Sequence, residues 1–406
     1  MRKITLLILL FSLGTVSLLA GGYQVRLQGQ KQTSIGLIGT PFAFDASGIF
    51  YNPGSLSFIK EKYSLSGGVS GIFSKIVFRP KDTDYTARTD NKMSTPFYFY
   101  GSAKITDDLT VGAGVFTPYG SSTTWDDDWH GRYIIQNIAL SAVFIQPTIS
   151  YKFMDKIGIG AGLDIVTGSV DLNQQIPAPV QGKVNLNGKS TAFGFNVGGY
   201  FRPIEALNIG IDYRSKVNMK VDEGDVEFTD IPTAVAADFP ADEKFSAELP
   251  LPANLDVGLS YQLTKKFLLA AEMNYIFWSV YDSLIIDFKE NNETLSDARN
   301  PREYENSIIF RLGGEFKFSE KFIARAGVYY DPTPTNKDYF TPETVSLDQI
   351  AFTLGISYMP VKGLNIDLSY LQLEGGEAEK SYSPENFTGT YRSRAFVPGI
   401  GLSYNF

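Results

Sequence analysis

The chain has 406 residues, a formal net charge of −8 and no cysteine. Nucleic acid is an unexpected partner because phosphate binding needs a basic face, and the lack of cysteine excludes both a disulfide framework and a lipoprotein. His130 is the single histidine, which leaves almost no material for His-based catalysis or a multi-His metal site. We therefore expect no enzyme activity, no catalytic residue, no metal and no cofactor.

The first twenty residues have the layout of a secretory signal peptide. Arg2 and Lys3 precede an almost unbroken apolar stretch from Ile4 to Leu19, and small residues follow. Leu18 occupies a position where a small residue is preferred, so a retained helical anchor is the alternative, although the stretch is short for a membrane span. We expect cleavage after residue 20, which moves the formal charge from −8 to −10 because two cations are lost.

Residues 21–62 follow no β periodicity. The segment is rich in glycine, with a short apolar core at Ile49–Tyr51 before Asn52-Pro53-Gly54. Forty residues are too many for a tail, and a large barrel encloses an open lumen unless it is plugged. We therefore expect residues 21–62 to fold as a plug and residues 63–406 to form the barrel around it.

Beyond residue 62 the dominant pattern is alternation of apolar and small or polar residues, as in Ile157–Ile165 and Ile400–Phe406. This period of two predicts β-strands. The mature chain has no apolar run of about 18 residues, so a membrane-spanning form must be a closed barrel. Fourteen strands are predicted, at residues 63–73, 95–105, 109–117, 138–153, 156–172, 188–202, 206–219, 246–263, 266–284, 305–318, 321–330, 347–360, 364–373 and 394–406. The predicted fold class is all-β, a 14-stranded antiparallel transmembrane barrel with an N-terminal plug in its lumen.

Short and long connections alternate strictly between these strands. Thr106–Asp108 and Ser319–Glu320 are two of the short ones, and residues 118–137 and 374–393 are two of the long ones. Outer-membrane barrels have short periplasmic turns and longer outer loops, whereas a soluble sandwich has no reason to segregate its loops. We interpret the acidic stretch Asp126–His130 as a solvated outer loop, with a cation site as the alternative.

Aromatic residues recur where strands approach the short turns. Tyr151, Tyr261, Tyr358 and Tyr404 occupy equivalent positions in near-identical tetrapeptides, and the chain ends on Phe406. Tyrosine prefers a membrane interface, with its ring in hydrocarbon and its hydroxyl in water. This pattern indicates an aromatic girdle and looks like the C-terminal signature of outer-membrane barrels.

Several charged residues fall on the predicted lumen face. Most are expected to pair with each other or with the plug. Arginine binds carboxylates with two parallel hydrogen bonds, so one of Arg214, Arg311 and Arg325 is a candidate for a fatty-acid carboxylate. Phe144, Ile276 and Trp278 are candidates for the apolar lining of a ligand path.

Two stretches resemble FadL-type outer-membrane transporters of long-chain fatty acids and aromatic hydrocarbons. Asp45–Leu56 is similar to the plug of that family, whose motif is usually Asn-Pro-Ala, so Gly54 departs from the pattern. Gly114–Gly120, continuing to Tyr133, is similar to the region around the third strand.

The resemblance implies 14 strands and a lateral route. In the family the third strand is kinked, the kink opens a gap in the wall, and the Asn-Pro motif lies against that gap. The wall opening would fall at Phe116, Thr117, Pro118, Tyr119 and Gly120, and the plug gate at Asp45, Asn52, Pro53 and Gly54. An apolar ligand would bind between outer loops, move to a pocket near the N-terminus of the plug and leave sideways into the outer leaflet. A plain plug turn is the alternative for the gate residues, and the end of a strand is the alternative for the wall opening.

The leading functional hypothesis is an outer-membrane uptake channel for hydrophobic small molecules. The alternatives are an accessory barrel of a protein secretion system, a membrane-embedded lipase or deacylase, and a general porin, which the plug segment disfavours. The expected partners are a hydrophobic small-molecule ligand, outer-membrane lipid, lipopolysaccharide and the barrel-assembly machinery.

Overall fold

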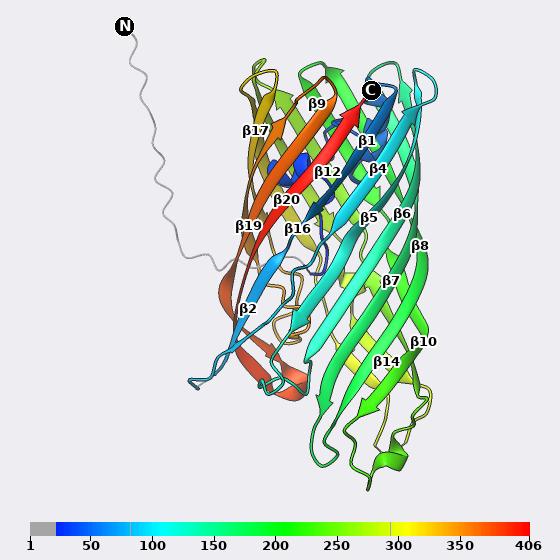
Figure 1. The fold of residues 1–406 in the computed structure, drawn as a ribbon, viewed down its shortest axis with the longest axis vertical. Coiled ribbons are helices and arrows are strands. Elements are labelled where there is room, and N and C mark those ends of the chain that lie inside the picture. Colours follow the sequence, from blue (N-terminus) through cyan, green and yellow to red (C-terminus); the bar gives the residue numbers. More distant parts are fainter. Residues whose placement is uncertain (1–21, 82, 293) are drawn as a thin grey trace.

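The computed structural model describes residues 22–81, 83–292 and 294–406. The predicted signal peptide therefore lies outside the described residues. The described chain consists mainly of β-strands arranged as a barrel, with a few short helices near its start (Figure 1).

Fourteen strands make the barrel wall, several of them interrupted into two segments. The segments are β1 (Tyr63–Ser70) with β2 (Phe73–Pro80), β3 (Ala87–Arg88) with β4 (Phe97–Lys104), β5 (Leu109–Thr124), β6 (Asn137–Phe153), β7 (Ile157–Ile176), β8 (Gly182–Ile204), β9 (Leu207–Arg214) with β10 (Val217–Thr229), β11 (Lys244–Leu251) with β12 (Asn254–Gln262), β13 (Phe267–Ile276) with β14 (Ser283–Phe288), β15 (Ala298–Pro301) with β16 (Ser307–Lys317), β17 (Phe322–Asp331), β18 (Gln349–Tyr358), β19 (Leu364–Tyr382) and β20 (Phe387–Asn405). Every neighbouring pair is antiparallel, and β1 pairs with β20 on one side and β4 on the other, which closes the sheet. The predicted closed 14-stranded barrel is confirmed.

The strands continue beyond several predicted ends. β5 reaches Thr124, β7 reaches Ile176, and β19 and β20 continue as a ladder out to Tyr382 and Phe387. The sequence prediction stopped at the end of the apolar alternation. Outside the membrane both faces of a strand meet water or loops, so the hydrogen-bonded ladder persists while the apolar pattern that marks it disappears.

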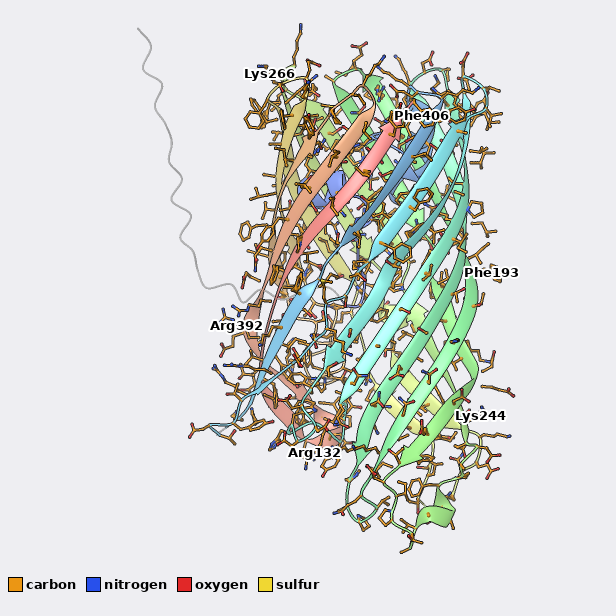
Figure 2. The ribbon with its side chains drawn as sticks, in the orientation of Figure 1. Arg132, Phe193, Lys244, Lys266, Arg392 and Phe406 are labelled. Atoms are coloured by element: carbon orange, nitrogen blue, oxygen red, sulfur yellow. The ribbon has the colours of Figure 1, made fainter. Side chains whose placement is uncertain are left out.

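Side chains separate by face as the alternation predicted. The four tyrosines of the predicted girdle, Tyr151, Tyr261, Tyr358 and Tyr404, are all exposed on the outside of the barrel. Figure 2 shows Phe406 and Lys266 at the end that carries the short turns and Phe193 projecting from the outer wall. Phe193 is 66% exposed, as expected for a side chain whose surroundings are lipid rather than protein.

The N-terminal segment lies inside the barrel, in the half that carries the short turns (Figure 1). It contains α1 (Gln30–Ser34), α2 (Gly48–Tyr51) and the 3₁₀-helix η1 (Pro53–Phe58), and every residue of these three helices is buried. No helix among the described residues is long and apolar enough to cross a membrane. The predicted plug is therefore present.

The outer loops fold back over the mouth of the barrel. Trp125 stacks on Trp129 with ring centroids 4.2 Å apart, and Phe78 packs edge-on against Trp129. Trp129 is fully buried, although Asp126 to Asp128 are exposed. The interpretation of Asp126–His130 as a solvated loop was therefore only partly right, because its tryptophan belongs to an apolar cap.

Candidate ligand path and plug

A buried cluster of charges anchors the start of the plug to the wall. Arg26 donates to Asp256 (3.0 Å) and Glu272 (2.9 Å), and Glu272 also lies 3.6 Å from Arg311. Glu272 accepts from the backbone N–H groups of Gly39 and Thr40. Burial lowers the pKa of Arg26, but Asp256 and Glu272 outweigh it and raise the net pKa, so the guanidinium stays charged.

A second cluster holds the middle of the plug. Lys31 lies 2.8 Å from Asp45 and donates to Ser403 of β20 (2.6 Å), and Asp45 also accepts from Ser47. Burial raises the pKa of the Asp45 carboxyl, whereas Lys31 and Ser47 lower it, and the net pKa is below the ordinary value. Asp45 is thus an ion-paired structural residue inside the plug.

Asn52-Pro53-Gly54 packs against glycines of β7 and β8. The Asn52 amide donates to the carbonyls of Thr40 (2.9 Å) and Gly199 (3.0 Å), and its side-chain oxygen accepts from Gly54. A Cβ on Gly54 would lie 2.7 Å from the carbonyl oxygen of Gly198. Glycine at position 54, where the family motif usually has alanine, therefore lets the plug approach the wall more closely. The motif lies against β7 and β8, not against the irregular part of β5, so its expected placement was wrong.

The wall is irregular at Pro118. β5 pairs with β4 only as far as Phe116, and its register with β6 shifts between Phe116 and Tyr119. Proline has no N–H to donate to a ladder, so pairing breaks where it stands. β5 nevertheless continues to Thr124 beside β6, which rules out the simpler reading that the strand ends here.

The free edge of β5 is paired by the N-terminus of the plug. The N–H of Gly120 donates to the carbonyl of Tyr23 (3.0 Å), and the N–H of Val25 donates to that of Pro118 (2.7 Å). Gln24 and Tyr119 face each other in an antiparallel bridge. An unpaired strand edge at membrane depth costs several kcal/mol for each unsatisfied group. Residues 23–25 therefore supply the partner that β4 does not.

Two cavities meet at this edge. The first, which we call the wall cavity, has a volume of ≈ 390 Å³ and extends along Thr117–Thr123 of β5 toward Ile72 and Phe97 on the other side of the irregularity. The second, the lumen cavity, has a volume of ≈ 100 Å³ and lies among the inward side chains of β5 to β8, β10, β11 and β14. Tyr119 and Gly120 line both cavities.

The lumen cavity is almost wholly apolar. Its walls include Tyr23, Leu186, Met219 and Phe245. Of its two acidic lining residues, Glu343 pairs with the buried Arg302 and Glu248 is exposed, and no lysine or arginine belongs to the lining that the structure describes. Burying an uncompensated charge is costly, so the cavity suits a neutral apolar ligand.

The three arginine candidates all have carboxylate partners. Arg214 binds Asp164 through both carboxylate oxygens (2.6 Å), Arg325 binds Glu315 (2.7 Å), and Arg311 lies 3.6 Å from Glu272. Arg214 also donates to the carbonyl of Phe50 in the plug. These arginines hold the structure together, and the lumen cavity is lined by none of them.

The three apolar candidates all lie in the buried core near the path. Phe144 faces Phe116 across the β5–β6 pair and contacts Tyr119 (ring centroids 6.0 Å apart). Trp278 packs edge-on against Tyr23 at 4.9 Å, and Ile276 is buried in the same core. They surround the lumen cavity without belonging to its lining.

The resemblance drew attention to Gly22-Tyr23-Gln24 and to movement of the plug's N-terminus, but sequence reasoning missed the pairing of Tyr23–Val25 with β5 and the role of Arg26. Their stretch has no periodicity that distinguishes it from the rest of the plug. One signal was present: Arg26 is a cation near the start of a segment expected to be buried, and the predicted lumen face of the barrel carries the acids Asp256 and Glu272 that pair with it.

Comparison with known proteins identifies the family. A model of the family described as "Outer membrane protein transport protein (OMPP1/FadL/TodX)" matches residues 11–406. The chain belongs to the OMPP1/FadL/TodX family. It is accordingly an outer-membrane protein and a transport protein for hydrophobic compounds rather than an enzyme.

Individual members of the OMPP1/FadL/TodX family are distant in sequence. Outer membrane protein P1 of Haemophilus influenzae is 26% identical over 76% of this chain and 74% of its own length. The crystal structure of a Pseudomonas aeruginosa FadL homologue superposes with a TM-score of 0.82 at 20% identity, covering 95% of this chain and all of the other. That of the Pseudomonas putida toluene transporter TodX has a TM-score of 0.76 at 17% identity, covering 93% and 98%. At these identities the two structures show the fold alone.

Proposed function

We propose that this protein takes up hydrophobic small molecules, aromatic hydrocarbons or long-chain fatty acids, and releases them sideways through the barrel wall at Phe116–Gly120. The observation that carries the proposal is the meeting of the lumen cavity with the wall cavity at Tyr119 and Gly120. A ligand in the lumen cavity is one side chain away from a break in the wall. An apolar ligand gains nothing from a water-filled exit, whereas lateral release leaves it in hydrocarbon.

The gate in this proposal is the N-terminal segment Tyr23–Val25. Two backbone hydrogen bonds hold it beside β5, and side-chain hydrogen bonds from Tyr23 to the carbonyl of Pro250 and from Gln24 to Asn254 hold it to β11 and β12. Withdrawal of so short a segment breaks few bonds, whereas moving the whole plug would break the buried ion pairs that join Arg26 to Asp256 and Glu272 and Lys31 to Asp367 in the wall. Asp45, Asn52, Pro53 and Gly54 then act as the fixed base of the gate and not as its moving part.

The lumen cavity favours neutral ligands over ionised ones. Its volume of ≈ 100 Å³ is of the same order as an apolar cavity of about 150 Å³ that binds benzene. Its lining holds no lysine or arginine, and Glu343 already pairs with Arg302, so an ionised carboxylate would be desolvated there and would gain no cationic partner. A small aromatic or a protonated acid meets neither cost.

Two neighbouring substitutions on β6 test the route. Ala142 faces inward, lines the lumen cavity and lies opposite Tyr119, so Ala142→Trp fills the junction. Val143→Trp places the same bulk on the lipid face of the same strand. With purified protein in liposomes, we expect Ala142→Trp to reduce uptake of a labelled aromatic hydrocarbon at least tenfold and Val143→Trp to leave it unchanged. Equal uptake by the two folded variants would contradict the route, and no uptake by wild type would contradict import.

We also propose that the barrel contacts lipopolysaccharide in the outer leaflet and is inserted by the barrel-assembly machinery. The apolar outer face supports the first part, and the C-terminal Phe406, exposed on the outer surface at the short-turn end, supports the second (Figure 2). The comparisons give no support to a secretion accessory.

A further inference from the structure

A group of cations that outnumbers its neighbouring acids lies on the outer face of the wall, where β2, β3 and β20 meet. The group, here called the basic cluster, consists of Lys75, Arg79, Arg88, Arg392 and Arg394. Together these side chains surround a cavity of ≈ 300 Å³. Arg392 projects outward from the wall in Figure 2.

The register shows that the basic cluster faces outward. Phe73 and Phe396 are cross-strand partners whose exposed rings stack 4.7 Å apart. Two residues further along the same pair, Lys75 lies opposite Arg394. Side chains two residues apart share a face, so these cations lie on the same surface as the stacked rings. Ile76 and Phe78, which alternate with Lys75 and Arg79 along β2, are buried on the inward face.

The position along β20 places the cluster at the edge of the hydrocarbon. Outward residues from Phe406 back to Phe396 are apolar and exposed, and Arg394 and Arg392 follow directly. Residues 396–406 are eleven positions, and a tilted strand needs about 9–11 to cross the hydrocarbon core. Arg394 and Arg392 therefore stand at the depth of lipid headgroups.

The cations of the cluster lack ion-pair partners in the part of the chain that the structure describes. None of the five forms an ion pair with any residue that the structure describes, and the nearest acids in register, Glu374 and Glu377 on β19, are opposite Arg394 and Arg392. Two exposed lysines elsewhere on the barrel do have partners: Lys220 pairs with Asp222 at 2.5 Å, and Lys244 pairs with Asp225. Five cations against two acids leave a net positive site, and close like charges favour an anion between them.

We propose that the basic cluster binds the phosphate groups of a phosphorylated outer-leaflet lipid. Arginine and lysine bind phosphate by charge-assisted hydrogen bonds. The stacked rings of Phe73 and Phe396, directly beneath the cluster, offer apolar surface for acyl chains, which free phosphate would not use. Lys75 and Arg394 also line the wall cavity, so the bound lipid would stand beside the wall opening. This inference requires only an outer-membrane location and does not depend on transport.

A pair of charge-matched variants tests the site. Arg392→Gln with Arg394→Gln removes two cluster cations, and Lys220→Gln with Lys244→Gln removes two paired cations on β10 and β11. We expect purified wild-type barrel in detergent to bind bis-phosphorylated lipid A, as measured by native mass spectrometry. The first variant should bind at least about tenfold more weakly, because it loses two charge-assisted contacts to phosphate, and the second should bind as wild type does.

Two further measurements separate the sources of binding. Dephosphorylated lipid A should bind much more weakly than the phosphorylated form, and millimolar inorganic phosphate should not displace the lipid. Equal binding by both double variants, or equal binding of the dephosphorylated lipid, would overturn the proposal. Full displacement by inorganic phosphate would overturn the lipid assignment. An unchanged β-sheet signal in circular dichroism shows that each variant is folded.

Discussion

At the scale of single residues, the plug is held by buried polar contacts that depend on one another. Arg26 satisfies two buried carboxylates, and each of them belongs to a wall strand. Removing one partner of a buried pair leaves an uncompensated charge, which costs more than the pair itself contributes.

Arg26→Met should therefore destabilise the protein by about 3–5 kcal/mol, because Asp256 and Glu272 lose their shared cation. Lys81→Met is the matched control. Lys81 pairs with Glu379 at 3.5 Å, and both side chains are more than half exposed, so the expected cost is about 0–1 kcal/mol. Denaturant unfolding in detergent measures both, and similar losses for the two variants would refute the anchoring role of Arg26.

Gly54→Ala should destabilise the protein although it restores the usual residue of the family motif. The added Cβ would lie 2.7 Å from the carbonyl oxygen of Gly198 and 2.8 Å from that of Gly158. Both are backbone atoms that cannot turn away, so we expect a loss of about 1–3 kcal/mol. Gly101→Ala, whose Cβ would meet only the end of Leu65 at 3.3 Å, should change stability little. A neutral Gly54→Ala would mean that the plug does not sit so close to the wall.

At the scale of elements, the two halves of β5 differ in their hydrogen-bonding partners. Residues 109–116 pair with full strands on both sides, whereas at Pro118–Gly120 the edge toward β4 is paired by the short segment Tyr23–Val25. Local opening costs less where fewer contacts must break.

The amide of Gly120 should consequently exchange with solvent deuterium faster than amides in residues 110–115 of the same strand. Its hydrogen bond is to Tyr23, which leaves with the gate. Hydrogen exchange with fragment analysis on the protein in nanodiscs measures this difference. Equal protection along the whole of β5 would mean that the edge is as firmly held as the rest of the wall.

Much of the element layout could be predicted from sequence, and the failures have a physical reason. Alternation arises from contact with lipid on one face and lumen on the other, so it marked the membrane part of strands such as β7 and β20. It carries no information where a strand rises into water, which is why the outer parts of β5 and β19 were assigned to loops. Pro118 predicted the break in the wall because the missing N–H is a property of the residue itself. The pairing of Tyr23–Val25 with β5 is a tertiary contact, and no periodic pattern in the sequence indicates it.

At the scale of the whole molecule, the barrel is filled rather than open. The plug occupies the half with the short turns, and Trp125, Trp129 and other apolar side chains of the outer loops cover the mouth. An apolar cavity between them opens toward the wall, and its lining lacks cations.

Binding of ligands should therefore depend on their charge. Toluene should bind with the same affinity from pH 5 to pH 8, whereas a long-chain fatty acid should bind more tightly as the pH falls and its carboxyl is protonated. Calorimetric titration across this pH range tests it, and fatty-acid affinity that is independent of pH would contradict the neutral-ligand assignment.

The most direct measurement of lateral release locks the gate with a reversible bond. Gln24 and Tyr119 form the bridge between the plug and β5, bounded by the hydrogen bonds of Val25 and Gly120. Such a non-hydrogen-bonded pair has Cα atoms about 4.5 Å apart, within disulfide range, and the chain has no cysteine of its own. In liposomes, Gln24→Cys with Tyr119→Cys should take up labelled toluene when reduced and lose most of that uptake when oxidised. Equal uptake in the two redox states, with the disulfide shown to be formed, would contradict release through the wall beside β5.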